Sequence, residues 1–167
     1  PEKLAEIVSK LEPTFGAVNL EDIKAPDCFI VERLCKEKMG IPVFHDDQHG
    51  TAIVASAAAL NALELSGKKI EDLRVVAVGA GAAGIACLKM LIVMGLRKEN
   101  ITLLDSKGVI HDGRNDLTFE KREFSKETDA RTLDDAIIGA DLFLGVSGPG
   151  VLTKEMVARM APAPVIF

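Results

Sequence analysis

One stretch of the sequence, residues 73–84, limits the folds open to this chain more than any other. Leu73 to Val78 is a β-branched apolar run of the kind that parallel sheets bury on both faces. It runs into the spacing Gly79-x-Gly81-x-x-Gly84, and Ile85 to Leu96 then has the apolar spacing of a helix. A glycine triplet between a strand and a helix is typical of a dinucleotide-binding loop, in which the glycines permit a tight turn, a close pyrophosphate and close helix packing. We therefore predict an α/β, Rossmann-like doubly wound parallel sheet with a nucleotide site, the alternative being a glycine turn without a ligand.

A second strand is predicted from Asn100 to Asp105. Asp105 stands 21 residues after Gly84, where an acidic side chain can bind the diol of a ribose. This position favours NAD over NADP. Ser106 and Lys107 follow, and Lys107 is either a partner for the 2′-phosphate of NADP or an exposed loop cation.

The remaining C-terminal sequence continues the α/β pattern. Residues 112–128 are highly charged and predict a surface loop with a short helix, and Leu133 to Ile138 predicts a helix with Thr132 as its cap. Asp141 to Ser147 predicts a buried strand. The Gly148-Pro149-Gly150 turn after it either receives the nicotinamide ribose or is a plain turn. A helix over 153–160 and a strand over 164–167 follow. The chain does not begin with Met, and no helix follows the last strand, so we predict a segment of a longer protein that is truncated at both ends.

Two acidic doublets follow two strands near the N-terminus. Glu21-Asp22 ends an extended run over 15–20, and Asp46-Asp47 follows a strand over 41–44. A helix over 28–38 lies between them, so a strand–helix–strand unit would place both doublets at neighbouring carboxyl ends of parallel strands. The oxygen ligands Glu21, Asp22 and Asp47 favour Mg²⁺ or Mn²⁺. The alternative is that these acids are solvated loop residues or helix caps.

The segment after Asp47 predicts a helix from Ala52 to Leu65 with Thr51 as its cap. This helix is apolar nearly all round, which predicts burial between layers, and Ser66-Gly67 ends it. His45 and His49 are expected either to be structural or to orient the site rather than to bind zinc, since Gly50 is expected to interrupt any helix that holds them both.

Composition narrows the classes of partner. The formal net charge of −5 argues against nucleic acid, and the longest apolar run is too short to span a membrane. Cys28 and Cys35 lie seven residues apart on one predicted helix, so both are expected to face the core as reduced thiols. Reduced thiols suit a cytoplasmic protein.

With these motifs in order, the chain resembles the bacterial type of malic enzyme. The resemblance rests on Asn19-Leu-Glu21-Asp22-Ile, Ile41-Pro-Val-Phe-His-Asp46-Asp47-Gln-His-Gly-Thr-Ala52, the Gly79 to Gly84 loop, Asp105-Ser-Lys-Gly and Gly145-Val-Ser-Gly-Pro-Gly150. It implies oxidative decarboxylation of malate to pyruvate and CO₂ with NAD(P)⁺, by an enzyme expected to form a homodimer. Residues 1–47 would be the edge of a substrate- and metal-binding domain, and residues 48–167 an incomplete NAD(P)-binding domain.

The resemblance also assigns individual residues. Glu21, Asp22 and Asp47 would bind the metal, and Asp46 would either lie next to the metal ligands without binding the ion or assist proton transfer. The residues expected to hold the cofactor are Thr51, Gly79, Gly81, Ala82, Ala83, Gly84, Asp105, Ser106, Lys107, Val146, Ser147 and Gly148. Members of the family use an upstream tyrosine and lysine as acid and base, yet this chain contains no tyrosine, and the family's Ala-Asn-Pro stretch would follow Phe167.

Two other interpretations fit parts of the sequence. The first is the cofactor domain of a metal-independent amino-acid dehydrogenase, and the second is a regulatory nucleotide-binding module without chemistry. Metal-dependent turnover of malate would distinguish a malic enzyme from the dehydrogenase and from the regulatory module.

Overall fold

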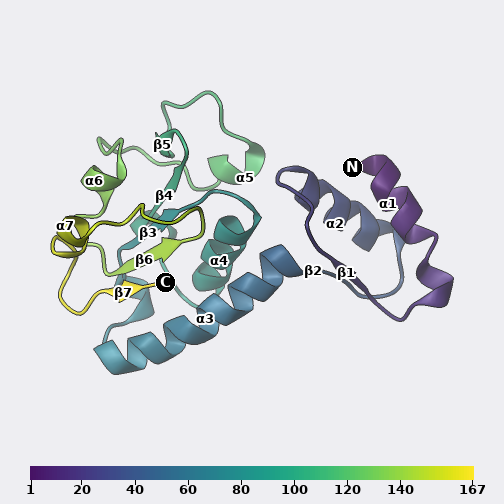
Figure 1. Cartoon of the computed structure of the whole chain (residues 1–167), viewed down its shortest axis with the longest axis horizontal. Coiled ribbons are helices and arrows are strands. Elements are labelled where there is room, and N and C mark those ends of the chain that lie inside the picture. The colour runs from purple at the N-terminus through teal and green to yellow at the C-terminus, as the bar shows by residue number, and fades with distance from the viewer.

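The computed structural model describes all 167 residues and contains two units joined through one long helix (Figure 1). The N-terminal unit consists of α1 (Glu2–Ser9), the 3₁₀ helix η1 (Glu12–Thr14), β1 (Val18–Leu20), α2 (Asp27–Lys38) and β2 (Val43–His45). Strands β1 and β2 pair in parallel, with Leu20 opposite His45. The predicted strand–helix–strand unit is therefore present, and Glu21 and Asp46 each follow the last residue of a paired strand.

The larger unit is built on a five-stranded sheet of order β5-β4-β3-β6-β7. All neighbouring strands are parallel except β5, which pairs antiparallel with β4. Its elements are α3 (Asp46–Ser66), η2 (Ile70–Asp72), β3 (Val75–Val78), α4 (Ala82–Val93), η3 (Lys98–Asn100), β4 (Ile101–Asp105), β5 (Gly108–Val109), α5 (Phe119–Arg122), α6 (Leu133–Ala136), β6 (Leu142–Gly145), α7 (Lys154–Val157) and β7 (Val165–Ile166). This sheet confirms the predicted doubly wound α/β fold.

The central strand β3 is buried on both faces, as its sequence predicts. Val75 and Ala77 belong to a core with residues of α3 and α4, whereas Val76 packs into a second core with residues around α6 and α7. Because side chains alternate along a strand, a run without polar residues needs helices on both sides. The two cores supply that cover.

The order of the strands reverses direction beside β3. Strand β4 follows through α4 on one side of β3, whereas β6 pairs with its other side. Open α/β sheets bind ligands outside the carboxyl ends of the strands at such a reversal. The loops after β3 and β6 therefore lie at the expected ligand edge.

Helix α3 begins six residues earlier than the sequence predicts. The expected start at Ala52 with Thr51 as cap was wrong, because β2 runs directly into a helix that starts at Asp46 and includes Gly50. Two carboxylates in the first turn favour this start through the helix dipole. A side chain at Gly50 would place its Cβ 2.5 Å from Asp46 Oδ1, so glycine leaves room for that carboxylate instead of breaking the helix.

Helix α3 is not buried between layers, which corrects a second expectation. Ala52, Ser56 and Ala59 form its buried face, whereas Val54 is 70% exposed and Leu65 is 90% exposed. One face of α3 packs on α4, whereas the side that carries Val54 and Leu65 is exposed. Gly67 ends the helix in the left-handed conformation at φ 66°, as predicted.

Several smaller expectations are confirmed. Cys28 and Cys35 are fully buried free thiols on α2, and burial raises the pKa of the Cys28 thiol to about 11. Thr132 caps α6 in a reciprocal arrangement with Asp135. No helix of the chain combines the length and the apolar character needed to cross a bilayer.

Candidate functional site

A cavity of about 790 Å³ lies at the carboxyl ends of the central strands. Its walls come from both units, since residues 24–26 and Phe29 of the N-terminal unit face the loops of the larger sheet. The other lining residues are Val78, Gly79, Ala80, Gly81, Ala82, Ile85, Asp105, Ser106, Thr118, Lys121, Ser147, Gly148 and Val151. Seven of the predicted cofactor residues are therefore brought together in one cavity.

The glycine loop has the geometry that its spacing predicts. Gly79 has φ 118°, and a Cβ there would lie 2.5 Å from the carbonyl oxygen of Val146. A Cβ on Gly84 would lie 1.8 Å from the carbonyl oxygen of Gly79, so the third glycine lets α4 approach the loop. Nothing lies within 4 Å of the corresponding position on Gly81. This open position suits the close approach of a phosphate.

The start of α4 adds favourable electrostatics for an anion. Gly81 precedes the helix without a side-chain cap, and the first turn from Ala82 contains no acidic residue. The first N–H groups of a helix lack partners within the helix and attract negative charge. Ala82 lines the cavity, whereas Ala83 and Gly84 do not.

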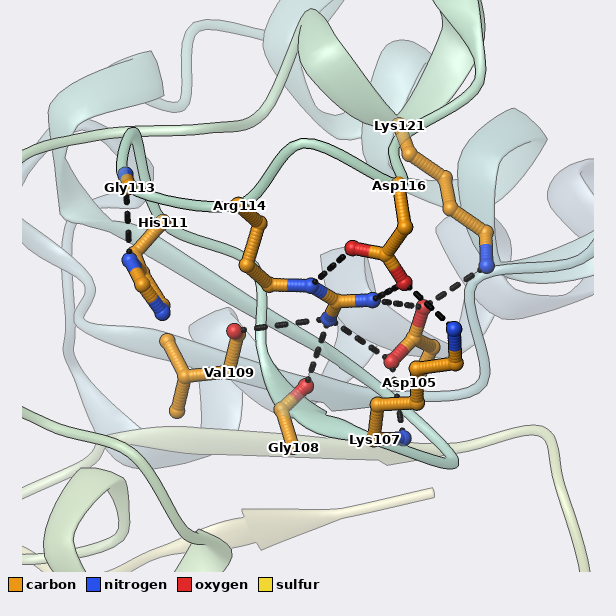
Figure 2. Close-up of polar contacts among 9 residues, drawn as sticks. All are labelled: Asp105, Lys107, Gly108, Val109, His111, Gly113, Arg114, Asp116 and Lys121. Atoms are coloured by element: carbon orange, nitrogen blue, oxygen red, sulfur yellow. Dashed lines mark hydrogen bonds and ion pairs between the residues drawn. The ribbon is translucent and has the colours of Figure 1, made fainter.

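Asp105 lies at the end of β4, and its carboxylate accepts hydrogen bonds from three residues of the chain (Figure 2). Arg114 donates from Nη1 to Oδ1 at 2.8 Å and from Nη2 to Oδ2 at 3.0 Å. Lys121 Nζ lies 2.7 Å from Oδ2, and the Lys107 backbone N–H donates to Oδ1 at 2.9 Å. A carboxylate accepts about four hydrogen bonds, so these donors fill Asp105.

Burial raises the pKa of the Asp105 carboxyl, but the bonds from Arg114 and Lys121 outweigh burial and hold it well below its usual range. Asp105 is therefore an ionised anchor for two cations. In this arrangement it has no free acceptor for the ribose diol on which the expected preference for NAD depended.

A second carboxylate, Asp116, belongs to the same network but does not line the cavity (Figure 2). Arg114 donates to Asp116 from Nε at 2.9 Å, and Lys107 Nζ lies 2.7 Å from Asp116 Oδ2. Lys107 is 67% exposed and does not line the cavity, so it is a poorer candidate than Lys121 for a phosphate partner. Arg114 and Lys121 were not predicted as site residues, because they lie in a charged segment predicted to be a surface loop with a short helix. The cations that follow an acid at a strand end were the available signal.

The loop after β6 completes the cavity. Ser147 and Gly148 line it, as predicted. Val146 instead supports the glycine loop, because its Cγ2 would lie 3.1 Å from a Cβ on Gly79 and 3.2 Å from one on Gly84.

Asp46 and Thr51 lie outside the main cavity. Both border a second cavity of about 560 Å³ between α3 and the end of β6. Its other lining residues are Gly50, Val54, Ala55, Ala58, Leu144, Gly145, Val146 and Phe167. The structure therefore brings the predicted catalytic acid together with Thr51 and Val146.

The two acidic doublets meet at the ends of β1 and β2. The Asp22 backbone N–H donates to Asp47 Oδ2 at 2.9 Å, and Asp22 has φ 58°, a left-handed conformation that Asp tolerates better than most residues. Glu21 Oε1 accepts a 2.7 Å bond from the Asn19 side-chain amide. Carboxylate oxygens are the kind of ligand that hard divalent cations prefer. The side chains do not converge as they stand, since no three His, Cys, Asp or Glu side chains group closely enough to hold a metal ion.

The two histidines occupy different environments beside these acids. His49 Nε2 lies 2.5 Å from Glu32 Oε1, so His49 contacts a carboxylate of α2. His45 is fully buried, and neither of its ring nitrogens makes a hydrogen bond.

Comparisons with known proteins agree on one family. A family model described as the malic enzyme NAD binding domain matches residues 48–167. The NADP-dependent malic enzyme of Halomonas elongata is 55% identical over all of this chain, which covers 40% of that protein. The NAD-dependent malic enzyme of Rhizobium meliloti is 55% identical over 99% of the chain and 22% of its own length.

A solved structure supports the same grouping. The crystal structure of Entamoeba histolytica malic enzyme superposes with a TM-score of 0.94 at 36% identity, covering 100% of this chain and 37% of that one. The chain thus spans between about a fifth and two fifths of the length of these relatives. The domain match, the whole-chain identity and the shared fold together show that this chain belongs to the malic enzyme family and carries its NAD-binding domain.

Proposed function

We propose that this chain supplies the NAD(P)-binding groups and the metal-binding carboxylates of an enzyme that oxidises and decarboxylates malate to pyruvate and CO₂. The observation that carries the proposal is the single cavity bordered by the glycine loop, Asp105 and the Ser147-Gly148 loop. Lys24 lines the same cavity and follows Asp22 by two residues, so the segment with the first acidic doublet lies next to the cavity.

The glycine loop and the start of α4 would bind the pyrophosphate of the cofactor. Gly81 leaves its backbone open, and the uncapped N–H groups from Ala82 onward offer donors to phosphate oxygens. Ser147 and Gly148 would border the nicotinamide ribose from the opposite side of the strand reversal. When bound, NAD(P)⁺ accepts a hydride from the malate carbon that bears the hydroxyl group.

Glu21, Asp22 and Asp47 would hold a divalent cation, with Mg²⁺ and Mn²⁺ favoured by their oxygen donors. When bound, such a cation acts as a Lewis acid toward substrate oxygens. Asp46 borders the second cavity with Thr51, where its carboxylate would accept and return a proton near the substrate.

Among the two nucleotides, we propose that NADP⁺ is preferred. The cluster at the end of β4 contains Arg114, Lys107 and Lys121 against Asp105 and Asp116, so cations outnumber carboxylates. Lys121 lines the cavity and is 24% exposed, which leaves it able to meet a 2′-phosphate. The proposal reverses the preference expected from Asp105 alone.

Assembly and compartment stay predictions. The family resemblance favours a homodimer, and the three reduced thiols favour the cytoplasm. Sedimentation of the complete enzyme at several concentrations would measure its oligomeric state.

The decisive experiment assays the complete parent protein with malate and each nucleotide, with and without Mn²⁺. We expect reduction of NADP⁺ and release of CO₂ only when the cation is present. Metal-independent oxidation of an amino acid would instead favour the dehydrogenase alternative, and cofactor binding without turnover would favour the regulatory module.

The 167-residue chain offers a separate check. Because the tyrosine and lysine used as acid and base in the family have no counterpart here, it should bind NADP(H) without oxidising malate. Malate- and cation-dependent reduction of NADP⁺ by this chain would contradict that expectation.

A further inference from the structure

A buried carboxylate joins the two units at a point that the proposed chemistry does not use. Glu32 lies on α2, and its side chain is only 10% exposed. Its Oε1 accepts from Lys36 Nζ at 2.6 Å and from His49 Nε2 at 2.5 Å, and its Oε2 accepts from Gln48 Nε2 at 3.0 Å. Two of these three donors belong to the first turn of α3. Glu32 therefore fastens α2 to the helix that leads into the larger unit.

Few other polar contacts hold this junction. Three hydrogen bonds involving side chains join residues 1–45 to residues 46–167, and Glu32 accepts two of them. The third runs from the Asp22 backbone to Asp47. A buried carboxylate without partners is costly, so the three hydrogen bonds to Glu32 favour one position of α2.

The position of α2 matters because this helix forms one wall of the cavity. Residues 24–26 line the cavity immediately before α2 begins at Asp27, and Phe29 of α2 lines it and packs against the core of the larger unit. A shift of α2 would therefore move this wall relative to Gly79 and Gly81, which line the same cavity.

We propose that Glu32 is a positioning residue, which holds the wall formed by residues 24–29 over the dinucleotide loop through its bonds to Gln48 and His49. This proposal rests on the proposed NAD(P) site. Hydrogen bonds from Lys36 and His49 outweigh burial and keep the pKa of the Glu32 carboxyl low, so the group is ionised at neutral pH and each bond is charge-assisted.

The test compares Glu32→Ala and Glu32→Gln with Glu37→Gln in the 167-residue chain. Glu37 is a matched control, since it lies on the same helix and pairs with Arg33 at 2.7 Å but is 55% exposed. NADPH binding is read from nucleotide fluorescence, which is simplified because the chain contains no Trp or Tyr. Hydrogen exchange of backbone amides reports where the structure loosens.

We expect Glu32→Ala to weaken the binding of NADPH about tenfold. This value corresponds to about nine tenths of the molecules with residues 24–29 displaced from their position in the wild type. Glu32→Gln keeps the volume and one acceptor, so it should lose less, and it carries the test if the alanine variant does not fold. Glu37→Gln should stay within about twofold, because exposed pairs contribute little. Exchange should accelerate at residues 24–29 and 46–50 but not in β3 and β4.

Two results would overturn the proposal. One is NADPH binding by both Glu32 variants that equals that of Glu37→Gln, with unchanged exchange at residues 24–29. The other is faster exchange throughout β3 and β4, which would indicate a general loss of stability. A wild-type chain that does not bind NADPH would contradict the proposed function instead, and the exchange pattern would then decide the role of Glu32 by itself.

Discussion

Replacing Lys121 by Gln should change the nucleotide preference more than the affinity for nucleotides in general. Lys121 Nζ lies 2.7 Å from Asp105 Oδ2 at the cavity wall, and Gln removes its charge while keeping a polar side chain. Asp105 would retain its two bonds from Arg114, so the end of β4 should stay folded. The expected loss of unfolding free energy is about 1 kcal/mol, because solvent around the partly exposed Lys121 screens this ion pair.

The expected effect on NADP(H) affinity is the loss of the one charged contact proposed between Lys121 and the 2′-phosphate. A hydrogen bond to a charged group contributes about 1.5–3 kcal/mol, which corresponds to a loss of affinity of about 10- to 150-fold. Partial exposure of Lys121 to solvent places the expected value near the lower limit. NAD(H) carries no 2′-phosphate, so its affinity should change by less than about threefold.

Equilibrium titrations of NADPH and NADH fluorescence would measure both affinities on the same protein samples. Lys107→Gln is the matched control, because Lys107 contacts the same network through Asp116 but lies outside the cavity. The reasoning fails if Lys121→Gln weakens both nucleotides equally, or if Lys107→Gln reduces the preference for NADPH as much as Lys121→Gln.

Three further perturbations test other parts of the site. Gly84→Ala should cost about 1–3 kcal/mol of stability and abolish NADPH binding, since its Cβ would lie 1.8 Å from the Gly79 carbonyl oxygen; an unchanged melting temperature would contradict the packing. Asp47→Asn should weaken Mn²⁺ binding in calorimetry yet leave the NADPH affinity within about twofold, and a normal Mn²⁺ affinity would remove Asp47 from the metal site. The pKa of Asp105 in the folded state lies below its unfolded value of about 3.9, so the stability that ionised Asp105 contributes is present above about pH 4 and is lost as the pH falls. Denaturation curves of Asp105→Asn should therefore show a smaller acid-induced loss of stability than those of the wild type. An equal loss would show that Asp105 does not cause the acid sensitivity.

The sheet could be predicted because its strands combine two simple signals. Val75 to Val78 contains no polar residue, and the glycine loop that follows defines the turn into α4. Cys28 and Cys35 lie seven residues apart, close to two helical turns, which explains why one buried face of α2 was readable from the sequence.

The start of α3 could not be predicted from local preference. Glycine disfavours helix interiors, yet Gly50 lies within α3, where a larger residue would meet the Asp46 carboxylate. The identity of this competing group becomes visible only when the helix is folded.

The environment of Asp105 was missed for a different reason. Its partners Arg114 and Lys121 follow it by 9 and 16 residues across turns and a short helix. Such segments have no fixed period, so sequence spacing does not reveal the directions of their side chains. The position of Asp105 was therefore predictable, whereas the filling of its acceptor sites was not.

The uninterrupted passage from β2 into α3 has a consequence for the modular use of this fold. Residue 48, where the family match begins, lies in the first turn of a 21-residue helix that is about 31 Å long. A cut at that residue would remove the two carboxylates that favour the start of the helix, and it would leave Glu32 without its donors on α3. Residue 48 is therefore a poor place to divide the chain, and a gene fusion should keep α2, β2 and α3 together with α4, on which α3 packs.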